Sequence, residues 1–289
     1  MAVKLQTFKD IRNYLSGELS ELYPLREAES IADAVILKVF GINRLSYILK
    51  GNDLIAGRRK TEKIVRYCNE LKTGKPLQYV TGETLFHDHI IKVCRGILIP
   101  RPETEELVDF VVKENKGFTG SIIDIGTGSG AIAIALAANF PSARITGVDI
   151  SGIAIKMAIR NAMNNNVAVT FLKADIFKII PSVLPMFDLI ISNPPYVRDS
   201  ERKYMKKNVL GFEPHRALFV PDSDPLKYYN AILKLADQIL NPRGSVYFEI
   251  NEAMGKQVSE ILELHKFSEI KIIKDLDGKN RIAKGKKDD

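Results

Sequence analysis

Hydrophobic residues in the first part of the chain recur with the spacing of amphipathic helices. Within "FKDIRNYLSGEL" the large apolar side chains fall on one helical stripe, formed by Phe8, Ile11, Leu15 and Leu19. The segment "EAESIADAVILKVFG" repeats this spacing and stops at Gly41, a residue type that often ends helices. These patterns predict helices, and no strand pattern interrupts them before about residue 75.

Two further helices are expected in the same region. Asn43 is a suitable N-cap for a short helix that would run through "RLSYILKG" to Gly51. Thr61 would open the next helix, which would continue to Leu71 and end near Gly74. Residues 1–75 are therefore predicted to form a small bundle of about four short helices.

The pattern changes at about residue 76. The stretch "GKPLQYVTGETLFHDHIIKVCRGILIPRPET" alternates apolar and polar residues, with Gly and Pro between the runs, and this is typical of one or two β-hairpins. We expect residues 76–103 to form a hairpin linker between the helical domain and a third region, residues 104–289.

Strand and helix patterns alternate from about residue 104 onward. Strands are predicted at "SIIDI", "ARITGVDI", "VAVTFLKAD", "MFDLIISN" and "GSVYFEI", with helices between them. The segment "EIKIIKDLDGKNRIAKGK" predicts a closing hairpin that turns near Asp277-Gly278, and the lysine-rich end "KGKKDD" is expected to fray. Regular alternation indicates an α/β domain with a parallel sheet covered by helices on both faces.

Composition excludes several classes of protein. The 289 residues are 45% apolar and 27% charged, which is ordinary for a globular protein. The apolar runs are much shorter than a bilayer span, and the first ten residues lack the apolar core of a signal peptide. We therefore expect a soluble, cytoplasmic protein. The spacings of Cys68 and Cys94 and of His87 and His89 are not typical of metal ligands, so no metal is expected.

The net charge of +7 is unevenly distributed. Residues 1–75 contain 14 Lys/Arg and 9 Asp/Glu, an excess of +5. This excess would suit an acidic partner such as RNA or an acidic protein surface. Charge alone, however, favours the simpler interpretation of a solvated basic face.

A glycine-rich loop follows the first strand of the predicted sheet. In "DIGTGSGAIAIAL", Gly126, Gly128 and Gly130 allow a tight turn and let a ligand approach the backbone closely. The backbone N–H groups and the start of the following helix favour an electron-rich ligand group. The spacing differs from the dinucleotide fingerprint G-x-G-x-x-G, because the third glycine comes one position early.

Acidic residues end three consecutive predicted strands. Asp124 could hold the ammonium group of an amino-acid-like ligand, directly or through the loop, while Asp149 could accept both hydroxyls of a ribose. Asp175 could accept from an adenine amino group. Because carboxyl ends of parallel strands share one crevice, amino acid, ribose and adenine together indicate S-adenosylmethionine. The alternative, that each acid only caps a turn, is less satisfactory for three acids than for one.

The sequence "ISNPPYV" places a polar corner at the same edge. Two prolines after Asn193 fix the backbone and remove two N–H donors, which leaves the Asn193 side-chain oxygen and the Pro194 carbonyl as acceptors. Tyr196 could pack its ring on a flat group. The corner therefore predicts binding of a planar NH2 group: adenine, guanine, cytosine or a carboxamide. A merely rigid turn would explain the prolines but not the residues that flank them.

Taken together, these motifs resemble a known family. "DIGTGSG" followed by "NPPY" is similar to class I, amino-directed methyltransferases. The flanking "PLQYVTGETLFHDHIIKV", "LIPRPETEELVD" and "GFEPHRALF" resemble the HemK/PrmC family, the glutamine N5-methyltransferases of peptide chain release factors. The resemblance implies an α/β, Rossmann-like methyltransferase domain with a mostly parallel seven-stranded sheet and a C-terminal antiparallel hairpin. A small helical bundle and a β-hairpin linker would precede it.

The resemblance also implies roles for individual residues. The residues implied to bind S-adenosylmethionine are Asp124, Gly126, Thr127, Gly128, Ser129, Gly130, Asp149, Asp175, Ile176 and Asn193. Asn193, Pro194 and Tyr196 would be catalytic. The substrate glutamine would be bound by Asn193, Pro194, Pro195 and Tyr196 and enclosed by Arg101 and Thr104 of "IPRPET". The products would be S-adenosylhomocysteine and a methylated Gly-Gly-Gln loop of a release factor, which the helical domain would hold.

Two departures from the family pattern accompany this resemblance. Ile176 stands where the family often has an aromatic residue, with Phe177 next, so the residue that stacks on adenine is left open. Asn251 replaces a usual glycine and is expected to alter only a local turn.

Other functions are less consistent with the motifs. An exocyclic-amine methyltransferase acting on DNA or RNA would share the corner, and the basic helical region weakly favours it. However, the chain has no large extra domain to flip a base, and direct nucleic-acid binding is not expected. The early third glycine and NPPY argue against a nicotinamide oxidoreductase, and the intact set of motifs argues against a non-catalytic binding module.

Overall fold

The computed structural model describes residues 5–50, 53 and 57–288. It contains two compact units, each described by itself below. The first comprises Met1–Gly82 together with Lys206–Phe212, and the second comprises Glu83–Met205 together with Glu213–Asp289.

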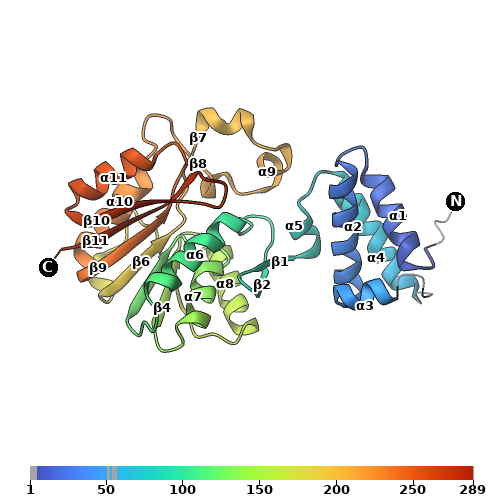
Figure 1. The fold of residues 1–289 in the computed structure, drawn as a ribbon, viewed down its shortest axis with the longest axis horizontal. Coiled ribbons are helices and arrows are strands. Elements are labelled where there is room, and N and C mark those ends of the chain that lie inside the picture. The colour runs from blue at the N-terminus through green and yellow to red at the C-terminus, as the bar shows by residue number, and fades with distance from the viewer. Residues whose placement is uncertain (1–4, 51–52, 54–56, 289) are drawn as a thin grey trace. The chain divides into compact units, whose positions relative to one another are not determined.

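The first unit is helical (Figure 1). Its helices are α1 (Phe8–Leu19), α2 (Leu25–Phe40), α3 (Arg44–Leu49), α4 (Arg58–Lys72), α5 (Leu77–Thr81) and, from later in the chain, α9 (Lys207–Phe212). The predicted apolar stripe of α1 is buried along its whole length. Gly41 ends α2 with a positive φ of 67°, and the Asn43 side chain caps α3 by accepting the Ser46 N–H at 2.8 Å. These three predictions are confirmed, whereas the expected end at Gly51 lies outside the described residues.

One detail of the helical prediction and one of the hairpin-linker prediction are wrong. Helix α4 begins at Arg58, three residues before Thr61, because the straight-chain residues ahead of Thr61 lose little rotamer freedom in a helix. The segment Leu77–Thr81 forms α5 although its alternating pattern resembles a strand. A helical conformation places Leu77 and Val80 on one side, and both pack on the hydrophobic core of the helical unit.

The second unit is built on a seven-stranded sheet with the order β10-β11-β9-β6-β3-β4-β5 (Figure 1). The strands are β3 (Ser121–Ile125), β4 (Arg144–Asp149), β5 (Thr170–Lys173), β6 (Phe187–Ser192), β9 (Leu240–Glu249), β10 (Phe267–Lys274) and β11 (Asn280–Lys287). Strands β9, β6, β3, β4 and β5 pair in parallel, and β11 is antiparallel to both of its neighbours. The predicted α/β class and the C-terminal hairpin are confirmed.

The chain end is more ordered than its composition predicts. Instead of fraying from residue 284, β11 continues to Lys287 and pairs with β9 through Lys284 and Lys286. The lysines are accommodated because acidic side chains face them: Lys284 forms an ion pair with Glu114, and Lys286 pairs with Glu269 at 2.8 Å. The prediction of a frayed lysine-rich tail is therefore wrong for the described part of this segment.

Short elements complete the second unit. A hairpin of β1 (Glu83–Phe86) and β2 (His89–Lys92) turns through His87 and Asp88, which both have positive φ. Strands β7 (Val197–Arg198) and β8 (Phe219–Val220) pair in parallel, close to the NPPY corner in sequence. Short 3-10 helices occur at η1 (Pro181–Val183), η2 (Asp199–Tyr204) and η3 (His215–Ala217).

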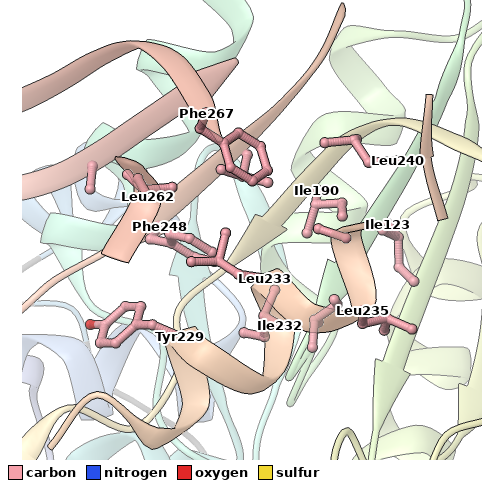
Figure 2. Close-up of a cluster of buried hydrophobic side chains, with 14 of the residues drawn as sticks. Ile123, Ile190, Tyr229, Ile232, Leu233, Leu235, Leu240, Phe248, Leu262 and Phe267 are labelled. Carbon is pink, nitrogen blue, oxygen red and sulfur yellow. The ribbon is translucent and has the colours of Figure 1, made fainter. Parts of the chain in front are cut away.

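Helices cover both faces of the sheet. Figure 1 shows α10 (Lys227–Ile239) and α11 (Gly255–Leu264) on one side, with α6 (Pro102–Glu114), α7 (Ala131–Asn139) and α8 (Gly152–Asn164) on the other. In Figure 2, Ile232 and Leu233 of α10 and Leu262 of α11 meet Ile123, Ile190 and Phe248 of the central strands. Since strand residues alternate between faces, Asp124 lies on the opposite side of β3 from Ile123 and Ile125.

No helix among the described residues combines the length and the apolarity that a membrane span requires.

Candidate active site

A cavity of about 520 Å3 opens at the carboxyl edge of the parallel strands. It lies where β3 has β4 on one side and β6 on the other, which is the switch point where open α/β sheets bind ligands. Its walls come from several places in the sequence: residues 96–104, the glycine loop, the ends of β4 and β5, the NPPY corner, residues 214–217 and the start of α10. The polar groups at this edge are therefore the candidate catalytic and binding groups.

Backbone hydrogen bonds fix the glycine loop. Gly126 and Thr127 donate their N–H groups to the Val148 carbonyl at 2.8 and 2.9 Å, which ties the loop to the end of β4. Gly126, Gly128 and Gly130 have positive φ values of 80°, 56° and 83°, as the sequence predicted for a tight turn. At Gly130 the packing is also close, because an added Cβ would lie 3.0 Å from the Cβ of Ala158 on α8.

Asp124 is fully buried beneath the loop and does not line the cavity. Its Oδ2 accepts the Thr127 hydroxyl at 2.6 Å, and its Oδ1 has no hydrogen-bond partner among the described residues. The pKa of Asp124 is raised to about 7, chiefly by burial and also by the charge of Asp149, while the hydrogen bond from Thr127 opposes the rise. The role predicted for Asp124 can therefore be exerted only through the loop.

Asp149 and Asp175 both line the cavity, as predicted from their positions at strand ends. The two carboxylate oxygens of Asp149 accept the N–H groups of Gly128 at 2.9 Å and Ser151 at 2.8 Å. Burial raises the pKa of Asp149, and these two backbone hydrogen bonds oppose the shift. Each oxygen retains a second lone pair, so the carboxylate can still accept a ligand hydroxyl. Asp175 accepts the Phe177 N–H at 3.0 Å, which orders the turn after β5.

The NPPY corner follows β6, the neighbour of β3 in the sheet, so it adjoins the glycine loop; Asn193, Pro194 and Pro195 line the cavity. Ser192 anchors the corner by donating its hydroxyl to the Ile125 carbonyl at 2.6 Å. The Asn193 Nδ2 donates to Thr104 Oγ1 at 3.0 Å, and Thr104 in turn donates to the buried Glu249 carboxylate at 2.6 Å. The structure thus brings together Asn193 and Thr104, which the sequence assigned to the same substrate.

Tyr196 occupies a different environment from the one predicted. It does not line the cavity, and its ring packs against the hydrophobic core beside α10. Its hydroxyl donates to Glu249 Oε1 at 2.8 Å. Burial raises the pKa of Tyr196 well above its usual value, and the neighbouring charge of Glu249 adds to this shift, so the hydroxyl stays neutral. Stacking of this ring on a substrate amide remains a prediction.

The segment "LIPRPET" is held over the cavity by a residue that the sequence did not single out. Glu213, which is 5% exposed, accepts the Ile99 backbone N–H at 3.2 Å and the Arg101 guanidinium at 2.5 Å. Arg101 and Thr104 both line the cavity, as predicted. The fixed backbone at Ile99 therefore sets the position of both side chains.

Ile176 and Phe177 both line the adjacent part of the cavity. The Phe177 ring lies 5.2 Å from the ring of Tyr228, centroid to centroid, and the ammonium of Lys227 lies over both rings. An aromatic pair is thus available one position after the site where the family pattern has its aromatic residue.

Comparisons with known proteins agree with this geometry. A family model described as methyltransferase small domain matches residues 103–211. A release factor glutamine methyltransferase of Bacteroides thetaiotaomicron is 39% identical over 272 residues, covering 94% of this chain and 97% of that protein. A protein with the same description from Flavobacterium psychrophilum is 39% identical over 280 residues, covering 96% and 98%. The chain belongs to the release factor glutamine methyltransferase family.

Solved structures support the fold of this family member. A methyltransferase from Pyrococcus furiosus superimposes with a TM-score of 0.52 at 21% identity, covering 81% of this chain and 100% of that chain. A ribosomal protein L11 methylase from Lactobacillus delbrueckii subsp. bulgaricus gives 0.50 at 19% identity, covering 70% and 87%. The resemblance stated from the motifs is confirmed, and the second unit is an S-adenosylmethionine-dependent methyltransferase domain of class I.

Three buried polar residues of this family member were not predicted as part of the site. Glu249 joins Thr104 to Tyr196, Glu213 holds "LIPRPET", and Asn161 of α8 donates to the Ser129 carbonyl at 2.9 Å. One signal was available for Glu249, since it ends the strand "GSVYFEI" at the same sheet edge as the predicted acids. Among the described residues, no group of three or more His, Cys, Asp or Glu could hold a metal ion.

Proposed function

We propose that this chain transfers a methyl group from S-adenosylmethionine to the side-chain nitrogen N5 of the glutamine in the Gly-Gly-Gln motif of peptide chain release factors. The observation that carries the proposal is the pair of acceptors at Asn193 and Pro194, which adjoin the glycine loop in one cavity. The chain's membership of the release factor glutamine methyltransferase family selects a glutamine carboxamide from the planar NH2 groups that such a pair could bind.

The residues around the glycine loop fit S-adenosylmethionine. Asp149 has free lone pairs for ribose hydroxyls, and Ile176, Phe177 and Asp175 surround the end of the cavity where adenine would bind. The backbone of Gly126–Gly130 would hold the amino-acid end, with Asp124 acting through Thr127. When bound, this cofactor supplies an electrophilic methyl group on a sulfonium, and S-adenosylhomocysteine is the expected product.

The corner would position the glutamine nitrogen. A carboxamide nitrogen is a poor nucleophile because its lone pair is delocalised, so alignment and polarisation by fixed acceptors must supply the rate. The Asn193 oxygen and the Pro194 carbonyl would each accept one hydrogen of the NH2 group. No strong base is required beforehand, because the nitrogen proton becomes acidic as the N–C bond forms.

We further propose that residues 1–75 hold the release factor while its Gly-Gly-Gln loop enters the cavity. The excess of +5 in this region suits an acidic protein surface. Translation termination is a cytoplasmic process, and this assigns the protein to the cytoplasm. The proposal requires neither a metal ion nor direct contact with nucleic acid.

The test is incubation of the full chain with S-adenosylmethionine and a bacterial release factor, followed by mass spectrometry of the tryptic Gly-Gly-Gln peptide. The expected result is one added methyl group, placed on the glutamine by fragmentation. A release factor whose glutamine is replaced by alanine is the matched control. An unmodified peptide, together with methylation of added DNA or RNA, would replace this function with a nucleic-acid amine methyltransferase.

A further inference from the structure

A chain of hydrogen bonds connects a buried carboxylate to Asn193, the side chain that would accept from the substrate. Glu249 is 1% exposed and lies at the end of β9. Its Oε2 accepts the Thr104 hydroxyl at 2.6 Å, and Thr104 Oγ1 lies 3.0 Å from Asn193 Nδ2. Thr104 itself is 4% exposed, so this chain of hydrogen bonds is shielded from competing water.

The donor and acceptor roles along this chain follow from its first member. Thr104 Oγ1 donates to Glu249 Oε2, so the single hydrogen of the hydroxyl is used in this bond. Thr104 Oγ1 therefore has only lone pairs to offer Asn193, and the amide must present its NH2 group to it. Asn193 Oδ1, which has no partner among the described residues, is left as the acceptor that the side chain offers to the cavity.

Glu249 also accepts a hydrogen bond through its second carboxylate oxygen. The neutral hydroxyl of Tyr196 donates to its second oxygen, Oε1, at 2.8 Å. The pKa of Glu249 is raised by its burial, and the hydrogen bonds from Thr104 and Tyr196 and the charge of Arg281 offset only part of this rise. The carboxylate is thus held from both oxygens and has a compensating cation nearby.

The orientation of Asn193 matters because the two ends of an amide have opposite hydrogen-bonding character. With Oδ1 toward the cavity, Asn193 and the Pro194 carbonyl are both acceptors and suit the NH2 group of a carboxamide. With the amide turned over, its NH2 group would face the cavity and suit a carboxylate. A glutamate side chain has nearly the shape of glutamine, so shape alone discriminates poorly between them.

We propose that Glu249 and Thr104 are positioning residues that lock the Asn193 amide in one orientation and thereby make the site select a carboxamide against a carboxylate. The inference rests on the proposed function, since it takes the Gly-Gly-Gln glutamine as substrate. Neither residue touches the reacting atoms; each acts through Asn193.

The decisive experiment compares two substitutions at one position. Thr104→Val keeps the shape of the side chain and removes the hydroxyl, whereas Thr104→Ser keeps the hydroxyl. Binding of a release factor with glutamine and of the same factor with glutamate in the motif is measured by calorimetry with S-adenosylhomocysteine present. The dissociation constant for the glutamate factor, divided by that for the glutamine factor, measures the selectivity. This ratio is expected to fall by about 10-fold or more in Thr104→Val, as for loss of a fixed polar contact, and to be largely restored in Thr104→Ser.

A second pair of variants examines Glu249, at the other end of this chain of hydrogen bonds. Glu249→Gln gives Thr104 a partner that can donate, so the amide of Asn193 is free to turn over, and the same ratio should fall. Tyr247→Phe is the matched control, because it removes a different, partly buried hydrogen bond on the same strand, from Asn115 to the Tyr247 hydroxyl at 3.1 Å. Tyr247→Phe should keep the wild-type ratio. Thermal denaturation checks that each variant is folded.

A third measurement is independent of the substrate. The side-chain NH2 signals of Asn193 in nitrogen-15 NMR spectra can be assigned by their loss in Asn193→Ala, and their hydrogen exchange should be faster in Thr104→Val than in wild type. Failure of the proposed function would appear as a wild-type protein that leaves the release factor unmethylated. Equal exchange in both proteins, or a wild-type binding ratio in Thr104→Val and Glu249→Gln, would overturn the positioning role.

Discussion

The two polar edges of the cavity are built by different means. Backbone groups form the glycine loop, whose N–H groups bond the Val148 carbonyl and the Asp149 carboxylate. Side chains form the NPPY corner, where Asn193 is held by Thr104 and, through it, by Glu249. Each edge rests on a buried acid, Asp124 under the loop and Glu249 under the corner. Only the first of these acids has an oxygen without a partner among the described residues.

This difference predicts which substitutions should affect folding and which should affect the methyl transfer. A change in the loop alters positive-φ backbone and close packing, so it should act on stability and cofactor binding together. A change in the corner alters the direction of a side-chain group, so it should act on turnover and selectivity with little effect on folding. Four substitutions test that division.

Asn193→Ala should have the largest effect on turnover. In the proposed mechanism, the substitution removes one of two fixed acceptors for the substrate NH2 group, and loss of one such contact costs roughly 10²-fold or more in rate. Single-turnover methylation of a release factor measures the loss, while calorimetry should show a smaller change in S-adenosylmethionine affinity. Near-normal turnover in this variant would reject the role assigned to the corner.

Gly130→Ala should lower stability because the glycine loop packs closely against α8. Gly126 and Gly130 have almost the same φ, 80° and 83°, so alanine at either position costs about 1–2 kcal/mol in backbone strain. A Cβ at Gly126 meets nothing within 4 Å, whereas at Gly130 it lies 3.0 Å from the Ala158 Cβ. Denaturant unfolding should therefore show Gly130→Ala to be less stable than Gly126→Ala by about 1–3 kcal/mol. Equal stabilities would mean that α8 moves without cost.

The contrast also explains which parts of the site the sequence could predict. The glycine loop and NPPY are contiguous motifs, and Asp149 and Asp175 follow strands whose apolar patterns are clear. The bond from Thr104 to Glu249 joins residues 145 positions apart, and that from Ile99 to Glu213 joins residues 114 apart. No local pattern encodes such pairs, because they form only once the strands and the preceding loop are packed.

Fold prediction succeeded and failed for a related reason. The parallel sheet followed from regular alternation of strand and helix patterns, which depends on short-range burial. The errors at Leu77–Thr81 and at Lys284–Lys287 arose where tertiary contacts override local tendency. The first segment is held by the apolar core of the helical unit, and the second by pairing with β9 and by acidic partners of its lysines.

Asp124→Asn should reveal the acid under the loop through the pH dependence of stability. Burial raises the folded-state pKa of Asp124 to about 7, above an unfolded value of about 3.9. The stability that comes from keeping this group protonated is fully present below about pH 4 and is lost as the pH rises through about 7. Relative to wild type, Asp124→Asn should gain stability between pH 5 and pH 8, by about 2–3 kcal/mol. If the denaturation midpoints of wild type and Asp124→Asn changed equally with pH across this range, the prediction would be contradicted.

Phe177→Leu should produce the smallest effect, and it asks whether a side chain also contributes to binding on the loop side of the cavity. Phe177 lines the cavity beside Ile176 and contacts the Tyr228 ring, so it is the aromatic group placed to pack on adenine. An aromatic contact of this kind is worth about 0.5–1.5 kcal/mol, which predicts a roughly 2- to 10-fold weaker S-adenosylmethionine affinity by calorimetry. Tyr204→Leu, at an exposed tyrosine that does not line the cavity, is the control. Because Phe177 would act on the adenine and not on the substrate nitrogen, the single-turnover rate at saturating cofactor should be unchanged, and a fall in that rate would mean that the two edges are coupled.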